Sequence, residues 1–373
     1  MPHHSAALSA DLVVVGAGVV GLAHAIEARA RGLSVVVIER DARAVGASVR
    51  NFGHVGTTLQ GGEAATYAAA ARDRWLDLAR KAGFEVLETG TVVVARSQAE
   101  LAVLEEFAGE HPDLARLLGS GQVRDLFPLA TAEVVGAAHL PRDLRIDPRE
   151  AIPALAAWLE STGVRFAWNT HVGSVEEGVV HTSRGDFRGA RIVCACGHNL
   201  DRLFPDIAED HGLQRCLLHM FEVAPPGDVR IGPAILTGTG MLRYSALAAM
   251  PSVAAVRAEI EKQHPELLDR VVNLMLTQRP DGSMVLGDTH HYDRTHQPFD
   301  DEGVAELLLR EGSRLLGAKL TVRRRWRGIY AESPATDFLI AQPHRGTRVV
   351  SVTSGIGMTT ALGLAPAVLD QLR

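Results

Sequence analysis

The residues with the clearest chemical meaning lie near the N-terminus, in the spacing Gly16, Gly18, Gly21 and then Glu39. In a strand–turn–helix unit, such glycines permit a tight turn, a close approach of the backbone to a pyrophosphate, and close packing of the helix on the strand. N–H groups at the start of the helix can bind phosphate. The carboxylate can accept hydrogen bonds from ribose hydroxyls. A glycine-rich turn without a ligand is the competing interpretation, but the complete pattern favours a dinucleotide site.

The elements around this pattern have the order that a dinucleotide site requires. The β-branched run after Asp11 predicts a buried parallel strand, and the Ala-rich stretch 22–31 predicts a helix that ends at Gly32. Residues 34–39 predict the next strand, which ends in Glu39. The glycines therefore lie between a strand and a helix, where they can act on a phosphate.

A second glycine-rich turn lies near the other end of the chain. Residues 348–353 predict a strand, and the sequence SGIGMT that follows leads into a last helix. This turn presents another helix N-terminus, whose N–H groups and dipole can stabilise negative charge. We therefore expect the two turns to converge on one extended cofactor, with the second turn facing its redox ring.

Length and composition describe an ordinary globular protein. The 373 residues suggest two domains, and the net charge of −6 does not favour nucleic acid or an anionic membrane as partner. The three cysteines, Cys194, Cys196 and Cys216, suit the reduced thiols of a cytoplasmic protein better than a disulfide framework. The sequence shows no signal-peptide pattern and no apolar run of about 18 residues, so we expect no membrane span.

Between the two turns, the sequence alternates predicted helices and strands. Apolar periodicity and end signals predict helices over 63–83, 101–110, 148–163 and 303–317. β-Branched runs and turn residues predict strands over 90–97, 213–223 and 323–330. They also predict a strand, a hairpin and a return strand within 164–198, and a hairpin within 275–292.

Several segments, taken in chain order, resemble the superfamily of D-amino-acid oxidase, glycine oxidase and sarcosine oxidase. They are the N-terminal turn with Glu39-Arg40, GASVRN (46–51), THVGSV (170–175), CACGH (194–198) and SGIGMT (354–359). The resemblance implies FAD as cofactor and an α/β fold, in which a Rossmann-like FAD-binding domain is interleaved with an α+β substrate domain built on an antiparallel sheet. It implies that the FAD-binding domain comprises residues 1–88, 144–213 and 326–373, and the substrate domain residues 89–143 and 214–325.

The same resemblance implies which residues contact FAD. Segment 46–53 is expected to run from the pyrophosphate toward the flavin, with Ser48 donating to a phosphate and Gly53 passing against the ring. Arg50 and Asn51 can bind phosphate or backbone, and the competing interpretation is that they form a surface turn. The expected cofactor contacts are Gly16, Gly18, Val20, Gly21, Glu39, Arg40, Ser48, Arg50, Asn51, Phe52, Gly53, Val172, Cys196, Gly197, Gly355, Ile356, Gly357, Met358 and Thr359.

The substrate side differs from the amino-acid oxidases of this superfamily. At the position of WRGIYA (326–331), those oxidases carry a segment that resembles WAGLRP. Tyr330 therefore replaces the arginine that pairs with a substrate carboxylate in them. This argues against a plain D-amino acid or glycine as substrate. Segments LRIDPREAI (144–152) and TQRPDG (277–282) resemble a branch proposed to oxidise aminophosphonates. The resemblance to that branch implies a small anionic amine, an aminophosphonate or an N-methylated relative, as substrate.

The candidate substrate contacts come from several parts of the chain. Arg327 lies close in sequence to Tyr330, but in a strand its side chain should point to the opposite face. A histidine taken alone is more often structural than catalytic, and metal sites at 194–198 or at DTHHYDRTHQ (288–297) are disfavoured, so we expect no metal. The candidates are His54, Arg243, Tyr244, His290, Arg327 and Tyr330.

The implied reaction moves a hydride equivalent from the carbon bearing nitrogen to flavin N5. The sequence indicates no dedicated general base. Oxygen as acceptor would give H2O2, but Val285 stands where sarcosine oxidases place an oxygen-activating lysine. A dehydrogenase that passes electrons to a quinone or carrier protein is therefore an alternative, and a non-catalytic flavin-binding protein is a third. No cysteine follows Cys216, and sarcosine oxidases attach their flavin to a cysteine near the equivalent of Gly328, so we expect non-covalent FAD.

Overall fold

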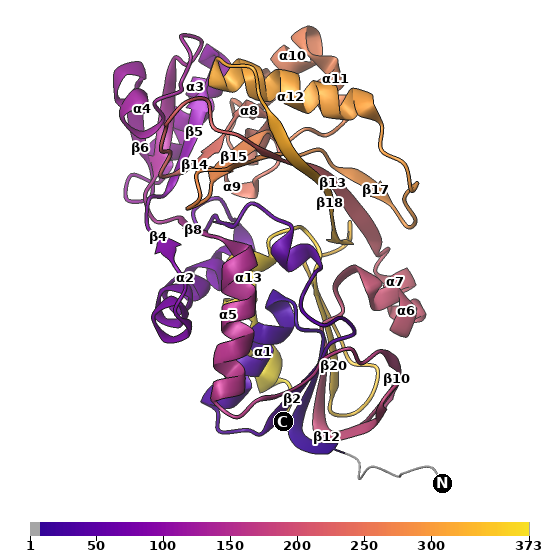
Figure 1. The fold of residues 1–373 in the computed structure, drawn as a ribbon. Coiled ribbons are helices and arrows are strands. Elements are labelled where there is room, and N and C mark those ends of the chain that lie inside the picture. Colours follow the sequence, from indigo (N-terminus) through magenta and orange to yellow (C-terminus); the bar gives the residue numbers. More distant parts are fainter. Residues whose placement is uncertain (1–7, 373) are drawn as a thin grey trace.

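Residues 8–372 are described by a computed structural model of the protein. The N-terminal stretch for which the sequence predicts no signal peptide lies mostly outside these residues. Within them, the strands form sheets of eight, nine and three strands. Figure 1 shows the eight-stranded sheet with the two chain ends in the lower half, and the nine-stranded sheet in the upper half.

The eight-stranded sheet has a parallel core. Its strands in spatial order are β9 (Arg165–Ala167), β2 (Val35–Ile38), β1 (Leu8–Val15), β12 (Gly185–Cys194) and β20 (Thr347–Val352). The antiparallel strands of this sheet are β10 (Val172–Glu176), β11 (Val179–Thr182) and β19 (Phe338–Ala341). Residues 12–15 of β1 and all four residues of β2 are buried, so both segments read as continuous runs of apolar residues.

The nine-stranded sheet is antiparallel except where β14 runs parallel to β5. Its path is β17 (His291–Asp293), β13 (Gln214–Val223), β16 (Met284–Gly287), β15 (Met275–Gln278), β14 (Ala234–Leu236), β5 (Thr91–Ala95), β7 (Gly136–Leu140) and β6 (Arg116–Gly119). β18 (Val322–Glu332) pairs along β13. The predicted domain boundary between residues 325 and 326 falls inside β18, and the division into two domains stays a prediction.

A small third sheet lies in the chain segments that connect the two larger ones. Its strands are β3 (His54–Val55), β8 (Leu144–Ile146) and β4 (Val86–Leu87), which pair antiparallel in that order. The strands are too short to show the alternation that reveals a strand in a sequence. The sequence therefore did not predict this sheet.

The helices cover these sheets in two groups. The group beside the parallel sheet comprises α1 (Val19–Ala30), α2 (Gly62–Ala82), α5 (Pro148–Ser161), α6 (Leu200–Leu203), α7 (Pro205–Asp210) and α13 (Gly357–Asp370). The group beside the nine-stranded sheet comprises α3 (Gln98–Glu110), α4 (Ser120–Leu126), α8 (Gly238–Met241), α9 (Ser245–Ala248), α10 (Val253–Gln263), α11 (Pro265–Asp269) and α12 (Glu302–Leu316). No helix within residues 8–372 is long and apolar enough to cross a membrane.

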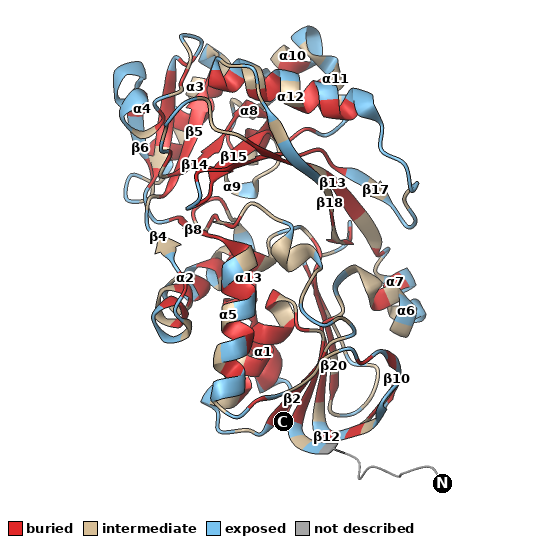
Figure 2. Ribbon diagram, in the orientation of Figure 1, coloured by how far each residue is buried: buried red, intermediate tan, exposed pale blue. Residues whose placement is uncertain are grey.

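The observed elements confirm the predicted fold class. A Rossmann-like parallel sheet is combined with a second, antiparallel sheet, and α1 follows β1 through the predicted turn. Figure 2 shows the buried residues concentrated on the strands and on the helix faces that cover them. Segment 164–198 contains the predicted strand, hairpin and return strand as β9, β10 with β11, and β12, and both β9 and β12 join the parallel core.

The contact between α2 and α13 depends on a glycine in the last helix. A Cβ added at Gly363 would lie 2.1 Å from the carbonyl oxygen of Tyr67 on α2. We therefore expect Gly363→Ala to force these helices apart and to lower the free energy of unfolding by about 1–3 kcal/mol. Denaturant unfolding measures this change.

Gly109 on α3 is the matched control, because a Cβ there would meet nothing within 4 Å. Gly109→Ala should stabilise the protein by up to ~1 kcal/mol, the ordinary gain of alanine over glycine in a helix. Equal effects of the two substitutions would contradict the proposed packing.

Candidate functional site

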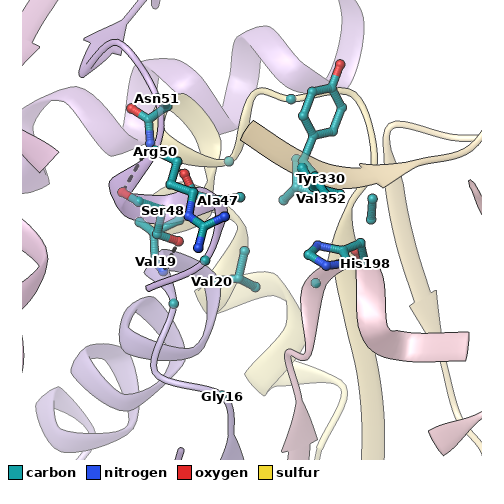
Figure 3. A pocket seen from close by; sticks show the side chains of 18 of the residues that line it. Gly16, Val19, Val20, Ala47, Ser48, Arg50, Asn51, His198, Tyr330 and Val352 are labelled. Atoms are coloured by element: carbon teal, nitrogen blue, oxygen red, sulfur yellow. Dashed lines mark hydrogen bonds between the residues drawn. The ribbon is translucent and has the colours of Figure 1, made fainter. Parts of the chain in front are cut away.

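An elongated cavity of about 400 Å³ lies where the two large sheets face each other. One end is lined by the glycine turn after β1 and by Glu39, the other by residues such as Arg243 and Asp288 that belong to the region of the nine-stranded sheet. Figure 3 shows Ser48 and Arg50 on one side of this cavity, with His198 and Tyr330 facing them from the other. The two predicted glycine turns therefore line one cavity.

The first turn is closed by backbone contacts that leave no room for side chains. Gly16 has a φ of +104°, and a Cβ there would lie 2.4 Å from the carbonyl oxygen of Ala195. A Cβ at Gly21 would lie 1.9 Å from the carbonyl oxygen of Gly16. Gly21 thus allows α1 to pack on the turn, and it does not itself line the cavity.

The N–H groups of this turn are divided between protein partners and the cavity. The N–H of Ala17 donates to Glu39 Oε2 at 2.9 Å, and that of Val19 donates to Ser48 Oγ at 2.9 Å. The N–H groups of Gly18 and Val20, which line the cavity, have no partner among residues 8–372. Two free N–H groups at a helix N-terminus suit a phosphate, so these residues fit the pyrophosphate of a dinucleotide.

Glu39 and Ser48 hold the turn and keep capacity for a ligand. Glu39 Oε1 accepts from the N–H of Asp41 at 3.1 Å, and a carboxylate can accept further hydrogen bonds from ribose hydroxyls. Since Ser48 accepts from Val19, its own hydroxyl proton can be donated into the cavity. Both residues line the cavity.

The segment after Ser48 is a single 3₁₀ turn, Ala47–Val49, stabilised by Asn51. Asn51 Nδ2 donates to the carbonyls of Ala47 and Ser48 at 3.0 and 3.1 Å, while Asn51 Oδ1 accepts from the N–H of Gly53. Asn51 and the solvent-exposed Arg50 both line the cavity. The position of Arg50 at the cavity wall favours the ligand interpretation of this segment over the surface turn.

Gly53 has a different position from the one expected. Its φ is +70°, and a Cβ there would lie 1.8 Å from the carbonyl oxygen of Ile146 on β8. It does not line the cavity. We therefore withdraw Gly53 as a flavin contact, because this glycine lets the chain approach the backbone of β8 closely. The neighbouring Phe52 does line the cavity.

The remaining predicted cofactor residues line the cavity from four places. The second turn contributes Gly355, Ile356, Gly357, Met358 and Thr359, and the N–H groups of Gly357 and Met358 have no partner among the described residues. The segment after β2, the start of β10 and the segment after β12 contribute Arg40, Val172, Cys196 and Gly197. Within residues 8–372, no group of three or more His, Cys, Asp or Glu side chains is placed to hold a metal ion.

The other end of the cavity contains a guanidinium held by two phenols. Arg243 Nη2 donates to the hydroxyl of Tyr330 at 2.7 Å, and Nη1 donates to the hydroxyl of Tyr292 at 2.9 Å. Tyr330 also packs on the second turn, since a Cβ at Gly355 would lie 3.0 Å from Tyr330 Cζ. No described carboxylate lies within ion-pair distance of Arg243.

Comparison with known proteins identifies the cofactor. Residues 11–371 match the family described as FAD dependent oxidoreductase (DAO). The chain belongs to this family. It is therefore an FAD-dependent oxidoreductase. We propose that the two glycine turns hold its FAD. None of the curated proteins compared with the chain matches it.

Solved structures share the fold over almost the whole chain. L-proline dehydrogenase from P. horikoshii has a TM-score of 0.81 and 18% identity, with 98% of this chain and 94% of that chain covered. Glycine oxidase from Geobacillus kaustophilus has a TM-score of 0.78 and 18% identity over 98% and 94% of the two chains. L-α-glycerophosphate oxidase from Mycoplasma pneumoniae, whose structure holds FAD, has a TM-score of 0.77 and 20% identity over 98% and 94%.

His54 and Tyr244 lie together on the wall of the FAD cavity, with their rings edge to face at 6.4 Å. Thr91 donates its hydroxyl proton to Asp143, so it accepts from His54 Nε2–H at 2.7 Å. Asp143 therefore fixes the orientation of His54 through Thr91.

Arg327 is the one candidate substrate contact that lies away from the cavity. Its Nε donates to Asp300 at 2.6 Å and its Nη1 to the carbonyl of Gln297 at 2.8 Å. It therefore lies on the opposite face of β18 from Tyr330, as alternation along a strand requires. We withdraw Arg327 from the substrate contacts, whereas His290 does line the cavity.

The structure adds cavity residues that the sequence did not single out. Asp288 and Asn273 line the cavity, and Asp288 is only 3% exposed. Burial raises the pKa of Asp288 to about 7, although Arg243 opposes the shift. The one signal in the sequence is an acidic residue directly after the apolar strand β16, which is also common in ordinary turns.

The raised pKa of Asp288 predicts a pH-dependent cost to stability. The ordinary pKa of this carboxyl is 3.8, so the folded protein binds its proton more tightly than the unfolded chain does. The contribution of Asp288 to the free energy of unfolding therefore falls as pH rises from about 4 to about 7. Asp288→Asn should therefore raise the unfolding temperature at pH 8 by ~2 °C or more, and by less at pH 5. Thermal unfolding of the FAD-loaded protein at both pH values measures the difference.

Glu105→Gln is the control, because Glu105 is an exposed carboxylate on α3 that does not line the cavity. It should change the unfolding temperature little at either pH. A difference for Asp288→Asn that does not depend on pH would contradict the raised pKa.

Proposed function

We propose that this protein oxidises the C–N bond of a small anionic amine, with FAD as hydride acceptor. The observation that carries the proposal is Arg243, a partly buried cation at the cavity whose hydrogen bonds go to phenols and not to a carboxylate. A guanidinium held in this way attracts an anionic group of a substrate, because charge-assisted hydrogen bonds are stronger than those to neutral oxygens. Glycine oxidase and L-proline dehydrogenase, which share the fold, are named for amino acids, and this supports an amine donor.

Tyr330 supports an anion other than an amino-acid carboxylate. By the resemblance described above, Tyr330 occupies the position at which the amino-acid oxidases carry an arginine. Its hydroxyl accepts a hydrogen bond from Arg243. The cation is thus supplied from the loop after α8 and not from β18. This relocation suits an aminophosphonate or an N-methylated relative, the substrate class implied by the resemblance of segments 144–152 and 277–282.

The chain's own residues would position the substrate at the redox ring. When bound, FAD supplies the acceptor for a hydride equivalent. Arg243 would orient the anion, with Tyr292 and Tyr330 fixing the plane of the guanidinium. The free N–H groups of Gly357 and Met358 at the N-terminus of α13 would stabilise negative charge on the ring. The proposed products are an aldehyde or keto compound and ammonia or a small amine.

The electron acceptor is proposed as oxygen, giving H2O2, or as a quinone or carrier protein. Val285, at the position of an oxygen-activating lysine in sarcosine oxidases, is 1% exposed and packs with Cys216, Leu218 and Met220. The dehydrogenase alternative therefore rests on the apolar Val285, which stands at the position of that lysine. Slow reoxidation of the reduced flavin in air, with fast reduction of a dye, would favour it.

We predict that FAD is bound without a covalent bond. Cys216, the last cysteine in the chain, lies on β13 opposite Tyr330, and burial raises its pKa to about 12. A thiol in that state is a poor nucleophile. Acid precipitation should therefore release the yellow colour to the supernatant, and colour retained in the pellet would contradict the prediction.

The proposed donor is tested by anaerobic flavin bleaching with a panel of amines. Aminophosphonates, N-methylated amino acids, D-amino acids and uncharged amines are compared, and peroxide is measured in air. We expect the anionic amines to bleach the flavin, and Arg243→Met to lower kcat/KM for them by about 100-fold or more through loss of the buried charge. Uncharged amines should be affected much less.

Arg257→Met is the matched control, since Arg257 is exposed on α10 and does not line the cavity. It should leave kcat/KM unchanged. Bleaching by D-amino acids while aminophosphonates leave the flavin oxidised would refute the substrate class. Stable FAD that no amine reduces would favour a non-catalytic flavin-binding protein.

A further inference from the structure

A buried carboxylate near Arg243 has one oxygen without a hydrogen-bond partner among residues 8–372. Asp288 follows β16 directly, lines the cavity, and its Oδ1 is buried without a hydrogen-bond partner among residues 8–372. Buried polar atoms of native proteins are almost always paired, because an unpaired one costs free energy. An unpaired carboxylate oxygen on a cavity wall therefore indicates a ligand that donates to it.

The neighbouring groups do not neutralise this carboxylate. His290 Nδ1 lies 3.9 Å from Asp288 Oδ1, but it hydrogen-bonds the carbonyl of Val271 at 3.0 Å. Burial, followed by the charge of Arg243, lowers the pKa of His290 well below its ordinary value, so the ring is uncharged. Arg243 directs its terminal nitrogens to Tyr292 and Tyr330. The cavity thus contains a cation and a carboxylate that are not paired with each other.

Asn273 adds a second acceptor beside Asp288. The two residues exchange backbone hydrogen bonds of 2.8 and 3.0 Å, which fixes their relative position. Asn273 Oδ1 is also buried without a partner among the described residues, and Asn273 also lines the cavity. Two fixed acceptor oxygens, one of them on a carboxylate, suit a group with several N–H donors and a positive charge.

We propose that Asp288 binds the ammonium group of the substrate and takes its proton, while Arg243 holds the anionic group. This inference rests on the proposed function and narrows the substrate class to amines that bind as zwitterions. In the proposed step, one N–H bond of the ammonium breaks, its electron pair stays on nitrogen, and the proton bonds to Asp288 Oδ1. No electron is transferred in this step. The proton leaves to solvent when the product departs, and the carboxylate is restored.

The oxidation requires that the substrate nitrogen lose a proton first. A substrate amine is an ammonium ion near neutral pH, and loss of hydride from the adjacent carbon requires a free electron pair on nitrogen. A base works best when its pKa lies near the operating pH, and burial raises the pKa of Asp288 to about 7.

The charged and titratable groups around Asp288 keep one protonation state between pH 5.5 and 8. Burial raises the pKa of Tyr244 and of Cys216 to about 12 in each case. His290 stays neutral, and Arg243 stays charged, because the neighbouring Tyr330, Tyr292 and Asp288 outweigh the effect of its burial on its pKa. His54 lines the same cavity, so the assignment of a pH effect to Asp288 needs a substitution as well as a pH change.

The test separates binding of the ammonium from oxidation. FAD-loaded protein is titrated under anaerobic conditions with two matched pairs, 2-aminoethylphosphonate against propylphosphonate and glycine against propionate. Each pair shares one anion and differs by an ammonium in place of a methyl group. Calorimetry gives the affinities at pH 5.5 and pH 8, and rapid mixing gives the rate of flavin bleaching by amines.

We expect the wild-type protein to prefer the ammonium member of at least one pair by about tenfold or more at pH 8, and to lose most of this preference at pH 5.5. Asp288→Asn should abolish the preference at pH 8 while leaving the affinity for propylphosphonate or propionate within a factor of about three. It should also lower the bleaching rate by about 100-fold or more, the usual contribution of a general base. Glu105→Gln should behave as wild type.

Two results would overturn the inference. One is an Asp288→Asn protein that keeps its FAD, the preference for ammonium and the wild-type pH profile. The other is a wild-type protein that binds neither ammonium compound better than its partner at pH 8. If amines still bleach the flavin in either case, the proposed function stands without this role for Asp288. If the preference follows Asp288 but no amine bleaches the flavin, the oxidation is refuted and the ammonium site remains.

Discussion

The close approach of three backbone segments at the first glycine turn is the constraint on which the rest of the structure depends. A Cβ atom at Gly21 would collide with the carbonyl oxygen of Gly16. A Cβ atom at Gly16 would collide with the carbonyl oxygen of Ala195. This stacking brings the end of β1, the start of α1 and the end of β12 together. Only with this approach can N–H groups of the turn point into a cavity that also receives Glu39 and Ser48.

The substrate end of the cavity is organised by charge and not by close packing. A guanidinium held by two phenols and a carboxylate with an unpaired oxygen both reduce stability when no ligand is bound, because buried charges and polar groups lose hydration. Apolar residues at these positions would make the folded protein more stable. The zwitterionic ligand proposed above would explain the presence of the charged groups on one cavity wall, because it would supply the missing partners.

The sequence predicted the parts of the fold and site that are encoded locally. Gly16, Gly18, Glu39 and Gly355 lie in short strand–turn–helix patterns, so their positions follow from neighbours in sequence. Asn273 and Asp288 pair just beyond the ends of β15 and β16. The predicted hairpin over 275–292 does not include Asn273, so the sequence did not bring the two residues together. The raised pKa of Asp288 exists only after burial, so no sequence pattern can show it. The sequence also placed Gly53 against the flavin, because a glycine with positive φ has the same signature beside a ligand and beside another strand.

The arrangement of β18 determines which of its residues can reach the cavity. Its alternation directs Tyr330 to the cavity and Arg327 to Asp300 on the other face, so an arginine on this strand reaches the substrate only at positions in register with Tyr330. Arg243 enters the same space from the loop after α8, through its hydrogen bond to the Tyr330 hydroxyl. In this chain, the cation at the substrate end of the cavity therefore comes from a loop and not from β18. Because the nine-stranded sheet and its loops supply the charged groups, substrate choice can change without disturbing the backbone contacts that hold the cofactor.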